Sequence, residues 1–142
     1  FPTKSGRGKL VPAHVQPPNE VPDDEFPIVL TTGRMLEHWH TGAMTRHATV
    51  LSTLEPEAVV SLHPRAIKTL GIEAGAKVSV TSRRGSITLR TRADKDVPES
   101  MAFIPFCFNE AAANLLTNPE LDPYGKIPEF KFAAVRVEKV SA

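Results

Sequence analysis

The sequence has 142 residues, of which 41% are hydrophobic and 23% charged, enough for one globular domain and too apolar for wholesale disorder. Seventeen basic and sixteen acidic side chains leave a net charge of +1, so no charge imbalance points to nucleic acid or an anionic membrane. No apolar run approaches the ~20 residues of a membrane-spanning helix. A single cysteine, Cys107, excludes an internal disulfide framework and cannot alone hold an iron–sulfur cluster. Because the sequence begins Phe1-Pro2, we interpret it as a piece of a longer polypeptide.

The first 25 residues differ in composition from the rest. They contain Pro17-Pro18 among several prolines, an acidic run at 23–25, and few large apolar side chains. Such a stretch cannot bury much surface, and its prolines favour extended backbone. We therefore expect residues 1–25 to form an extended linker or arm, and residues 26–142 to form the folded domain.

Short apolar runs rich in β-branched residues predict most of the domain's elements. The segments predicted as strands are 27–32, 58–62, 77–81, 87–91, 101–108 and 132–140. Residues 82–85 supply a hairpin turn between two of them, and Pro105 indicates an edge strand or a bulge. Short helices are expected at 64–70, with Pro64 at its start and Gly71 after its end, and at 110–116. Short strands without a βαβ rhythm predict a mainly β fold with short helices, a small β-barrel.

The segment 31–46 stands apart chemically. It contains the only tryptophan and directly follows the first predicted strand, where a rigid scaffold can present polar groups to a ligand. Arg34 and Arg46 offer forked donors suited to phosphate, and Trp39 offers a flat wall for a heterocycle. The residues predict a pocket for a phosphorylated or ring-bearing ligand. A packed lid, whose Trp and His merely fill space, is the competing interpretation.

Other candidate sites are weaker. His38 and His40 could both reach one ion, but no further ligands follow at suitable spacing, so no metal site is predicted. Cys107 is expected to be a small core residue. The arginines at 83–92 are interpreted as a polar hairpin tip, because nearby acids and the lack of interleaved aromatics argue against nucleic acid.

Two later stretches carry polar groups beside aromatic ones. Asn109 and Asn114 both have the amide donors and acceptors needed to read a heterocycle edge. Asn109 is expected instead to cap the helix that follows it, and the residues alone leave the role of Asn114 open. Lys131 lies between Phe130 and Phe132, where it could sit near a ligand. By itself this pattern is more typical of a solvated strand edge.

Residues 32–46, TGRMLEHWHTGAMTR, resemble the segment that opens the C-terminal molybdopterin-dinucleotide-binding domain of molybdenum or tungsten oxidoreductases. The resemblance runs from about residue 26 to 140. Formate dehydrogenases and periplasmic nitrate reductases are the most similar in pattern, and residues 110–117 and 126–131 look more like the formate dehydrogenase version. The resemblance implies a six-stranded double-psi β-barrel over residues 26–142.

It also implies a domain that covers one side of a bis(molybdopterin guanine dinucleotide) cofactor with molybdenum or tungsten. Phe106 matches a position on the substrate side of the pocket. The residues implied as cofactor contacts are Thr32, Gly33, Arg34, Met35, Leu36, Glu37, His38, Trp39, His40, Thr41, Asn114 and Lys131. No catalytic residue and no metal ligand is expected in this chain, because the metal-ligating residue and the iron–sulfur clusters of such enzymes belong to other domains.

The resemblance thus predicts the cofactor-capping C-terminal domain of a formate dehydrogenase catalytic subunit, acting in the oxidation of formate to carbon dioxide and without turnover alone. Its expected partners are the remaining domains of its own subunit, electron-transfer subunits and formate, with no nucleic acid and no membrane insertion. A cytoplasmic location is expected, with the periplasm as the alternative. The competing functions are the same domain of a periplasmic-type nitrate reductase and a stand-alone pterin-cofactor-binding module.

Overall fold

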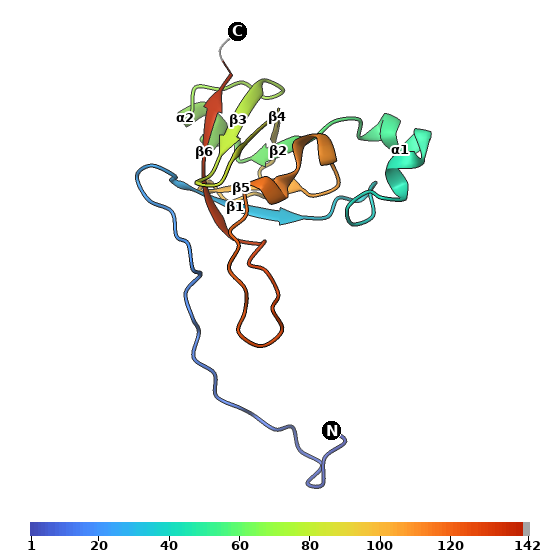
Figure 1. Cartoon of the computed structure of the whole chain (residues 1–142), viewed down its shortest axis with the longest axis vertical. Coiled ribbons are helices and arrows are strands. Elements are labelled where there is room, and N and C mark those ends of the chain that lie inside the picture. Colours follow the sequence, from blue (N-terminus) through green and yellow to red (C-terminus); the bar gives the residue numbers. More distant parts are fainter. Residues whose placement is uncertain (141–142) are drawn as a thin grey trace.

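Six short strands close into a barrel in the computed structural model, which describes residues 1–140 (Figure 1). The strands are β1 (Ile28–Gly33), β2 (Val59–Leu62), β3 (Lys77–Thr81), β4 (Ser86–Ala93), β5 (Met101–Pro105) and β6 (Ala133–Lys139). Their order around the barrel is β1-β5-β2-β4-β3-β6. The prediction of a mainly β, six-stranded barrel is confirmed.

Strand direction divides the barrel into two parallel pairs joined by antiparallel contacts. β1 runs parallel to β5, and β2 runs parallel to β4. The remaining neighbours, including the β3–β4 hairpin, are antiparallel. Parallel neighbours need long crossover connections, so each pair joins segments that lie far apart in the sequence. This topology is the one expected of a double-psi barrel.

Side chains fill the inside of the barrel. On β4, buried Ile87, Leu89 and Thr91 alternate with exposed residues, as the period of two requires. Leu62 and Val78 are fully buried within the same core. A six-stranded barrel is narrow enough for its own side chains to fill it. A ligand therefore has to bind outside the barrel, where loops leave the strands.

The helices are short and lie outside the barrel. They are the α-helices α1 (Thr49–Leu54) and α2 (Pro64–Thr69) and the 3₁₀ helices η1 (Thr45–His47), η2 (Asn109–Ala111) and η3 (Ala113–Leu115). α2 begins and ends as predicted: Pro64 is its first residue, and Gly71 takes a φ of +64° after its end. The Gly71 and Ile72 amides donate to the Lys68 and Ile67 carbonyls, the two bonds of a Schellman motif. None of the helices within residues 1–140 is long and apolar enough to cross a membrane.

The prediction of one helix over 110–116 is wrong. Two single 3₁₀ turns, η2 and η3, replace it, separated by Ala112 in an extended conformation. Ala111 and Ala113 are both buried in the core, and residues two apart point to different sides of an α-helix. A continuous α-helix could not bury both alanines, so the segment forms two separate 3₁₀ turns. The capping role of Asn109 is also wrong, because Phe108 occupies the N-cap position and no side chain caps this turn.

Two other expectations are corrected. β5 ends at Pro105 instead of running to residue 108, and it is no edge strand, because β1 and β2 flank it on both sides. Proline lacks the amide hydrogen that would continue the ladder. The helices η1 and α1 were not predicted. Neither has a side-chain cap or a buried residue, so the sequence carries no amphipathic or capping signal for them.

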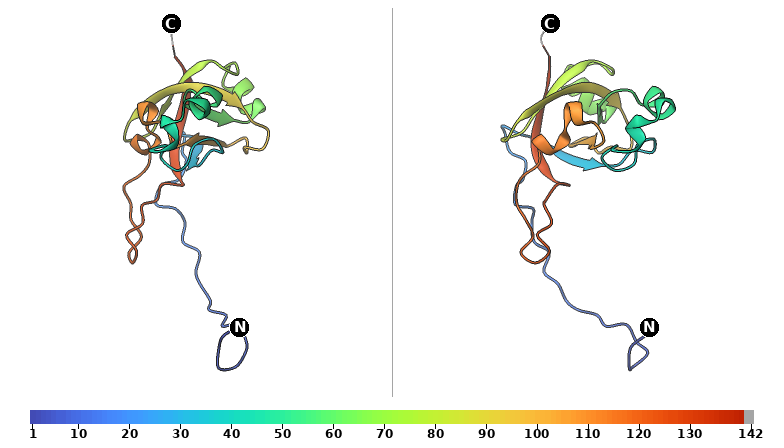
Figure 2. Two further views of the ribbon diagram at one scale, coloured as in Figure 1. Left: turned by 90° about the vertical axis from the view of Figure 1, so that its right-hand side faces the viewer. Right: turned by 45° about the vertical axis from the view of Figure 1, so that its right-hand side comes forward.

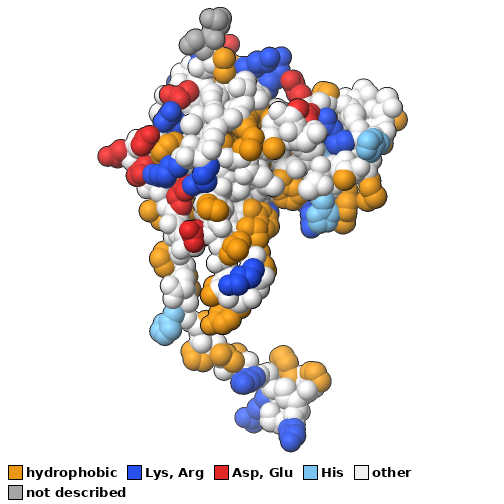
Figure 3. Space-filling model, viewed as in Figure 1, with side chains coloured by type: hydrophobic (Ala, Val, Ile, Leu, Met, Phe, Trp, Pro, Cys, Tyr) orange, Lys and Arg blue, Asp and Glu red, His pale blue; other side chains and the backbone are white. Residues whose placement is uncertain are grey.

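Residues 1–25 contain no helix or strand and run away from the barrel beside the loop that precedes β6 (Figures 1 and 2). Basic side chains gather at the far end of this arm (Figure 3). Leu10 and Val15 are almost fully exposed, whereas Glu20 is partly buried where the arm reaches the barrel. The arm thus contacts the barrel through its last residues, around Glu20, and not through its N-terminal part.

Candidate functional site

A cavity of about 350 Å³ opens beside the barrel, outside its filled core. The residues that line it are Thr41, Phe106, Asn114, Thr117, Pro128 and Phe130. Thr41 lies in the loop after β1, and Phe106 directly follows β5. Asn114 lies in η3, and Thr117 follows shortly after it. Pro128 and Phe130 lie in the loop before β6. The structure therefore brings the three stretches singled out in the sequence to one place.

The parallel pairing of β1 and β5 creates this meeting point. Gly33, at the end of β1, stands in register with Pro105, at the end of β5, so both chains leave the barrel on the same side. The Phe106 amide then donates to the Gly33 carbonyl at 3.1 Å. Loops at the carboxyl ends of paired strands are held on a rigid base, which suits them to presenting ligand contacts.

Lys131 brings positive charge to the cavity. Its Nζ donates to the Thr32 carbonyl at 2.7 Å and lies 5.4 Å from the ring centroid of Phe130 and 5.8 Å from that of Phe106. Within residues 1–140 no carboxylate pairs with it. An ammonium held by carbonyl and ring contacts keeps a net positive charge available for an anionic ligand.

Arg34 is a second cation without a carboxylate partner in the described part of the chain. It is exposed, and its Cζ lies 5.4 Å from the Trp39 ring centroid. Arg46, in contrast, forms an ion pair with Glu110 at 2.8 Å and lies over the Phe108 ring. The loop after β1 thus has one arginine available for a ligand and one used in the protein.

His38 lies in the core, away from the cavity lining. The side chain is fully buried, its Nε2 lies 3.2 Å from the Glu55 carbonyl oxygen, and its ring meets Phe108 edge-on at 5.7 Å. Its Nδ1 has no hydrogen-bond partner within the described residues. Met35 also turns inward, with its Sδ 3.3 Å from Cys107 Sγ. These two side chains anchor the loop to the protein beneath it.

Gly33 is enclosed by the neighbouring strand. A Cβ at Gly33 would lie 2.6 Å from a Phe103 ring carbon, so any other residue here would have to displace that ring. Thr32 is buried and donates to the Phe130 carbonyl at 2.6 Å, linking β1 to a cavity wall. Gly33 and Thr32 thus hold the base of the loop and one cavity wall in place, without lining the cavity themselves.

The remaining predicted contacts lie on the outer part of the loop. Leu36 is 96% and Trp39 57% exposed, and Glu37 is half-buried. His40 is half-buried, with a φ of +50° and its ring edge-on to Trp39 at 4.4 Å. Of the predicted contacts, Thr41 and Asn114 line the cavity itself, as does the predicted substrate-side residue Phe106.

Sequence reasoning missed three lining residues: Thr117, Pro128 and Phe130. Thr117 donates to the Asn114 carbonyl at 3.2 Å, and Phe130 adjoins Lys131. All three lie within a few residues of a predicted contact. No local pattern marks them, because only the meeting of separate loops turns them toward one cavity.

The chemistry of the lining fits a nucleotide-bearing group. Thr41, Asn114 and Thr117 offer neutral donors and acceptors, Phe106 and Phe130 offer aromatic surface, and the neighbouring Lys131 offers a cation. Within residues 1–140 no three His, Cys, Asp or Glu side chains gather in a way that could hold a metal ion. The arrangement suits binding and orienting an anionic heterocyclic ligand.

Cys107 is expected to resist alkylation by a maleimide at neutral pH in the native protein. It is buried, and burial raises the pKa of its thiol to about 11, so both access and thiolate are lacking. Reaction should be complete within minutes after denaturant is added, as followed by mass spectrometry. Native modification as fast as that of a free thiol would contradict the core placement of Cys107.

The fold and the cavity together define a closed β-barrel domain with a ligand-sized cavity outside its core. The family model described as "Molydopterin dinucleotide binding domain" matches residues 28–134. The chain therefore belongs to the molybdopterin-dinucleotide-binding domain family.

Named relatives extend the comparison. The chain is 44% identical over 140 residues to the F420-dependent formate dehydrogenase subunit alpha of Methanocaldococcus jannaschii, covering 99% of this chain and 21% of that protein. It is 40% identical to the F420-dependent formate dehydrogenase 1 subunit alpha of Methanococcus maripaludis, covering 97% and 20%. The chain thus spans about a fifth of the length of these relatives.

A solved structure, acetylene hydratase from Pelobacter acetylenicus, superposes with a TM-score of 0.72 at 20% sequence identity. The match covers 81% of this chain and 18% of that one. At this identity the likeness shows a shared fold.

Proposed function

We propose that this chain is the cofactor-capping C-terminal domain of a formate dehydrogenase catalytic subunit, and that its cavity holds part of a molybdopterin guanine dinucleotide. The observation that carries this proposal is the convergence of Thr41, Phe106 and Asn114, with Lys131 beside them, at one cavity of a molybdopterin-dinucleotide-binding barrel. The names of the relatives support formate over nitrate as the substrate of the complete enzyme.

The side chains of this domain bind and orient. Lys131 and Arg34 offset the charge of the pyrophosphate, because neither is neutralised by a carboxylate of residues 1–140. Thr41 and Asn114 hydrogen-bond polar atoms of the ligand, and Phe106 closes the side that faces the substrate. The outer loop, through Trp39 and His40, shields the cofactor from water.

The bis(molybdopterin guanine dinucleotide) group, with molybdenum or tungsten, supplies the two-electron chemistry that oxidises formate to carbon dioxide. In this proposal the metal ligand and the iron–sulfur clusters belong to the other domains of the subunit, and electron-transfer subunits are its partners in the cytoplasm. The present domain contributes affinity, orientation and positive charge. It has no turnover without the rest of the subunit.

Arg34→Ala is expected to lower cofactor retention by the complete catalytic subunit about 10- to 100-fold, because a charge-assisted hydrogen bond is worth ~1.5–3 kcal/mol. Arg34 is exposed and its truncation removes only a contact with the exposed Trp39 ring, so the fold should be preserved. Guanine and molybdenum or tungsten content after dialysis measures the effect. Arg65→Ala is the control, since Arg65 pairs with Glu99 in an exposed ion pair. Equal contents in both variants would remove Arg34 from the site.

The substrate is tested with the complete protein. Formate oxidation and nitrate reduction are measured side by side with artificial electron carriers. Formate oxidation is the expected activity. Nitrate reduction without formate oxidation would replace the proposal with the nitrate reductase alternative.

A further inference from the structure

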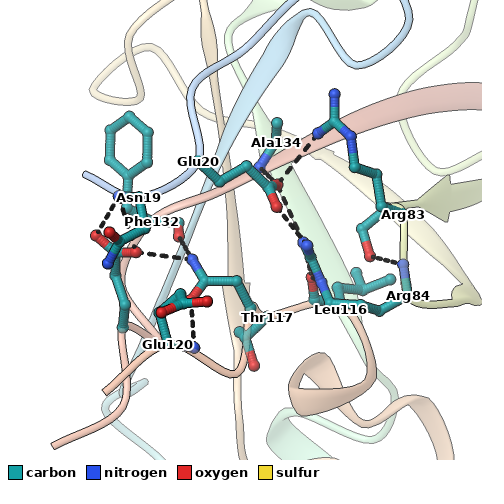
Figure 4. A network of polar contacts seen from close by, with 12 residues as sticks. Asn19, Glu20, Arg83, Arg84, Leu116, Thr117, Glu120, Phe132 and Ala134 are labelled. Atoms are coloured by element: carbon teal, nitrogen blue, oxygen red, sulfur yellow. Dashed lines mark hydrogen bonds and ion pairs between the residues drawn. The ribbon is translucent and has the colours of Figure 1, made fainter. Parts of the chain in front are cut away.

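Glu20 belongs to the N-terminal arm and precedes the family-matched residues 28–134, yet it reaches the barrel (Figure 4). Its side chain is only 12% exposed. The carboxylate accepts hydrogen bonds from the Arg84 guanidinium and from the Ala134 amide, and it lies 3.6 Å from Arg83. One carboxylate therefore joins the arm, the β3–β4 hairpin turn and the first part of β6.

Arg84 connects Glu20 to one wall of the cavity, which is formed by η3 and the residues that follow it. Its Nε and Nη2 both donate to the Leu116 carbonyl, at 3.1 and 2.8 Å. Leu116 is fully buried and lies between Asn114 and Thr117, which both line the cavity. The hairpin also packs closely on this wall, since a Cβ at Gly85 would lie 3.1 Å from the Leu115 carbonyl oxygen.

Ala134 connects Glu20 to the chain that forms a second wall, the loop before β6. It is the second residue of β6 (Ala133–Lys139) and lies three residues after Lys131. A second link runs beside it: Glu129 accepts from Asn118 Nδ2 at 2.9 Å and from the arm amide of Asn19 at 3.2 Å. The arm thus contacts the start of β6 through Glu20 and Ala134, and the loop before β6 through Asn19 and Glu129.

The Glu20 carboxylate remains ionised at neutral pH. Burial raises the pKa of Glu20, but hydrogen bonds from Arg84 and Ala134 and the charges of Arg84 and Arg83 outweigh burial and lower it. A shielded charge-assisted contact is stronger than an exposed ion pair. The contact is therefore suited to hold segments in place.

We propose that Glu20 is a positioning residue that clamps the two cavity walls together, by holding Arg84 on the Leu116 carbonyl while accepting the Ala134 amide. The arm is then part of the cofactor site and is more than a spacer between domains. This inference rests on the proposed function in one respect, that the cavity holds the dinucleotide. The link between the walls stands on the hydrogen bonds alone.

Glu20→Gln in the complete catalytic subunit tests the clamp by hydrogen–deuterium exchange. Glutamine has the same shape but lacks the charge that fixes Arg84. Exchange in segments 113–118 and 128–134 should rise about tenfold, while β3 (Lys77–Thr81) stays unchanged. Glu25→Gln is the matched control: Glu25 lies in the same arm and approaches Arg136 at 3.5 Å, but it contacts neither wall.

Arg84→Lys separates the two walls. A single ammonium cannot hold the carboxylate and the Leu116 carbonyl with the forked geometry of a guanidinium. Exchange should therefore rise in 113–118 but not in 128–134, where Glu20 still accepts the Ala134 amide. Faster exchange in both segments would contradict the role assigned to Arg84.

Release of the intact molybdopterin guanine dinucleotide from the holoenzyme, measured as GMP after acid hydrolysis of the released cofactor, provides the functional measurement. Glu20→Gln should release it about tenfold faster than Glu25→Gln and wild type. The clamp is overturned if exchange in Glu20→Gln is unchanged, if it rises equally in every strand, or if it rises locally while release stays the same. A wild-type subunit without guanine nucleotide would overturn the proposed function instead, and the exchange pattern would still decide whether Glu20 links the walls.

Discussion

Replacing Phe108 with alanine is expected to lower the free energy of unfolding by about 3–5 kcal/mol. Phe108 is the largest of the fully buried side chains. The His38 ring meets it edge-on at 5.7 Å, and the Arg46 guanidinium carbon lies 4.5 Å from its centroid. Its removal leaves a cavity in the core and takes away the surface on which the loop after β1 rests.

Urea denaturation followed by circular dichroism measures this loss. Tyr124→Ala is the control, because Tyr124 is 93% exposed and its truncation should change stability by less than about 0.5 kcal/mol. A loss below about 1 kcal/mol for Phe108→Ala would show that the core closes around the gap, contrary to the close packing described here.

Gly42→Ala is expected to cost about 2–4 kcal/mol, through a strained backbone and a collision. Gly42 has a φ of +75°, and a Cβ there would lie 2.8 Å from the Cys107 carbonyl oxygen and 2.5 Å from Arg46 Cγ. The arginine can move, but the backbone oxygen is held by the segment that follows β5. The loop must therefore shift, and Thr41 leaves its place in the cavity wall.

The matched control is Gly75→Ala. Gly75 has a φ of +83° but open space where its Cβ would be, so it carries only the conformational cost of about 1–2 kcal/mol. Denaturation of both variants separates the two contributions. Equal losses would mean that the Cys107 oxygen does not limit the loop.

Local patterns in the sequence predicted the parts of the fold that local physics decides. The alternation of Val78 and Val80 with polar neighbours marked β3, and residues 82–85 marked its turn. Pro64 and Gly71 marked the ends of α2. Each of these signals acts through backbone geometry or burial within a few residues, so distant contacts do not override it.

Where distant contacts compete with local preference, the sequence misled. The alanine-rich stretch 110–116 favours a helix, but the core buries Ala111 and Ala113 together and divides it. Pro105 suggested an edge strand or a bulge, and closure of the barrel excludes the edge, because β5 has a neighbour on each side. Tertiary packing outweighs helix propensity of a few tenths of a kcal/mol per residue.

The candidate site, like the fold, was predictable from the sequence only in part. The residue types that suit a nucleotide were recognisable in the sequence, and the segments containing Thr41, Phe106, Asn114 and Lys131 were each singled out. Their orientation was not recognisable. Nothing local distinguishes an inward His38 from an outward His40, because the irregular loop has no period to assign them to faces.

By itself the amino-acid sequence determined the strand-rich character, the family and the chemical groups available for binding, since composition, periodicity and motif spacing are properties of the chain. Only the folded molecule decided which of those groups share a cavity and which serve as supports. That choice follows from pairing strands roughly seventy residues apart, as in Gly33 beside Pro105, and from a carboxylate of the arm reaching across to Arg84. Long-range register is a cooperative outcome of the whole core, and no short segment encodes it.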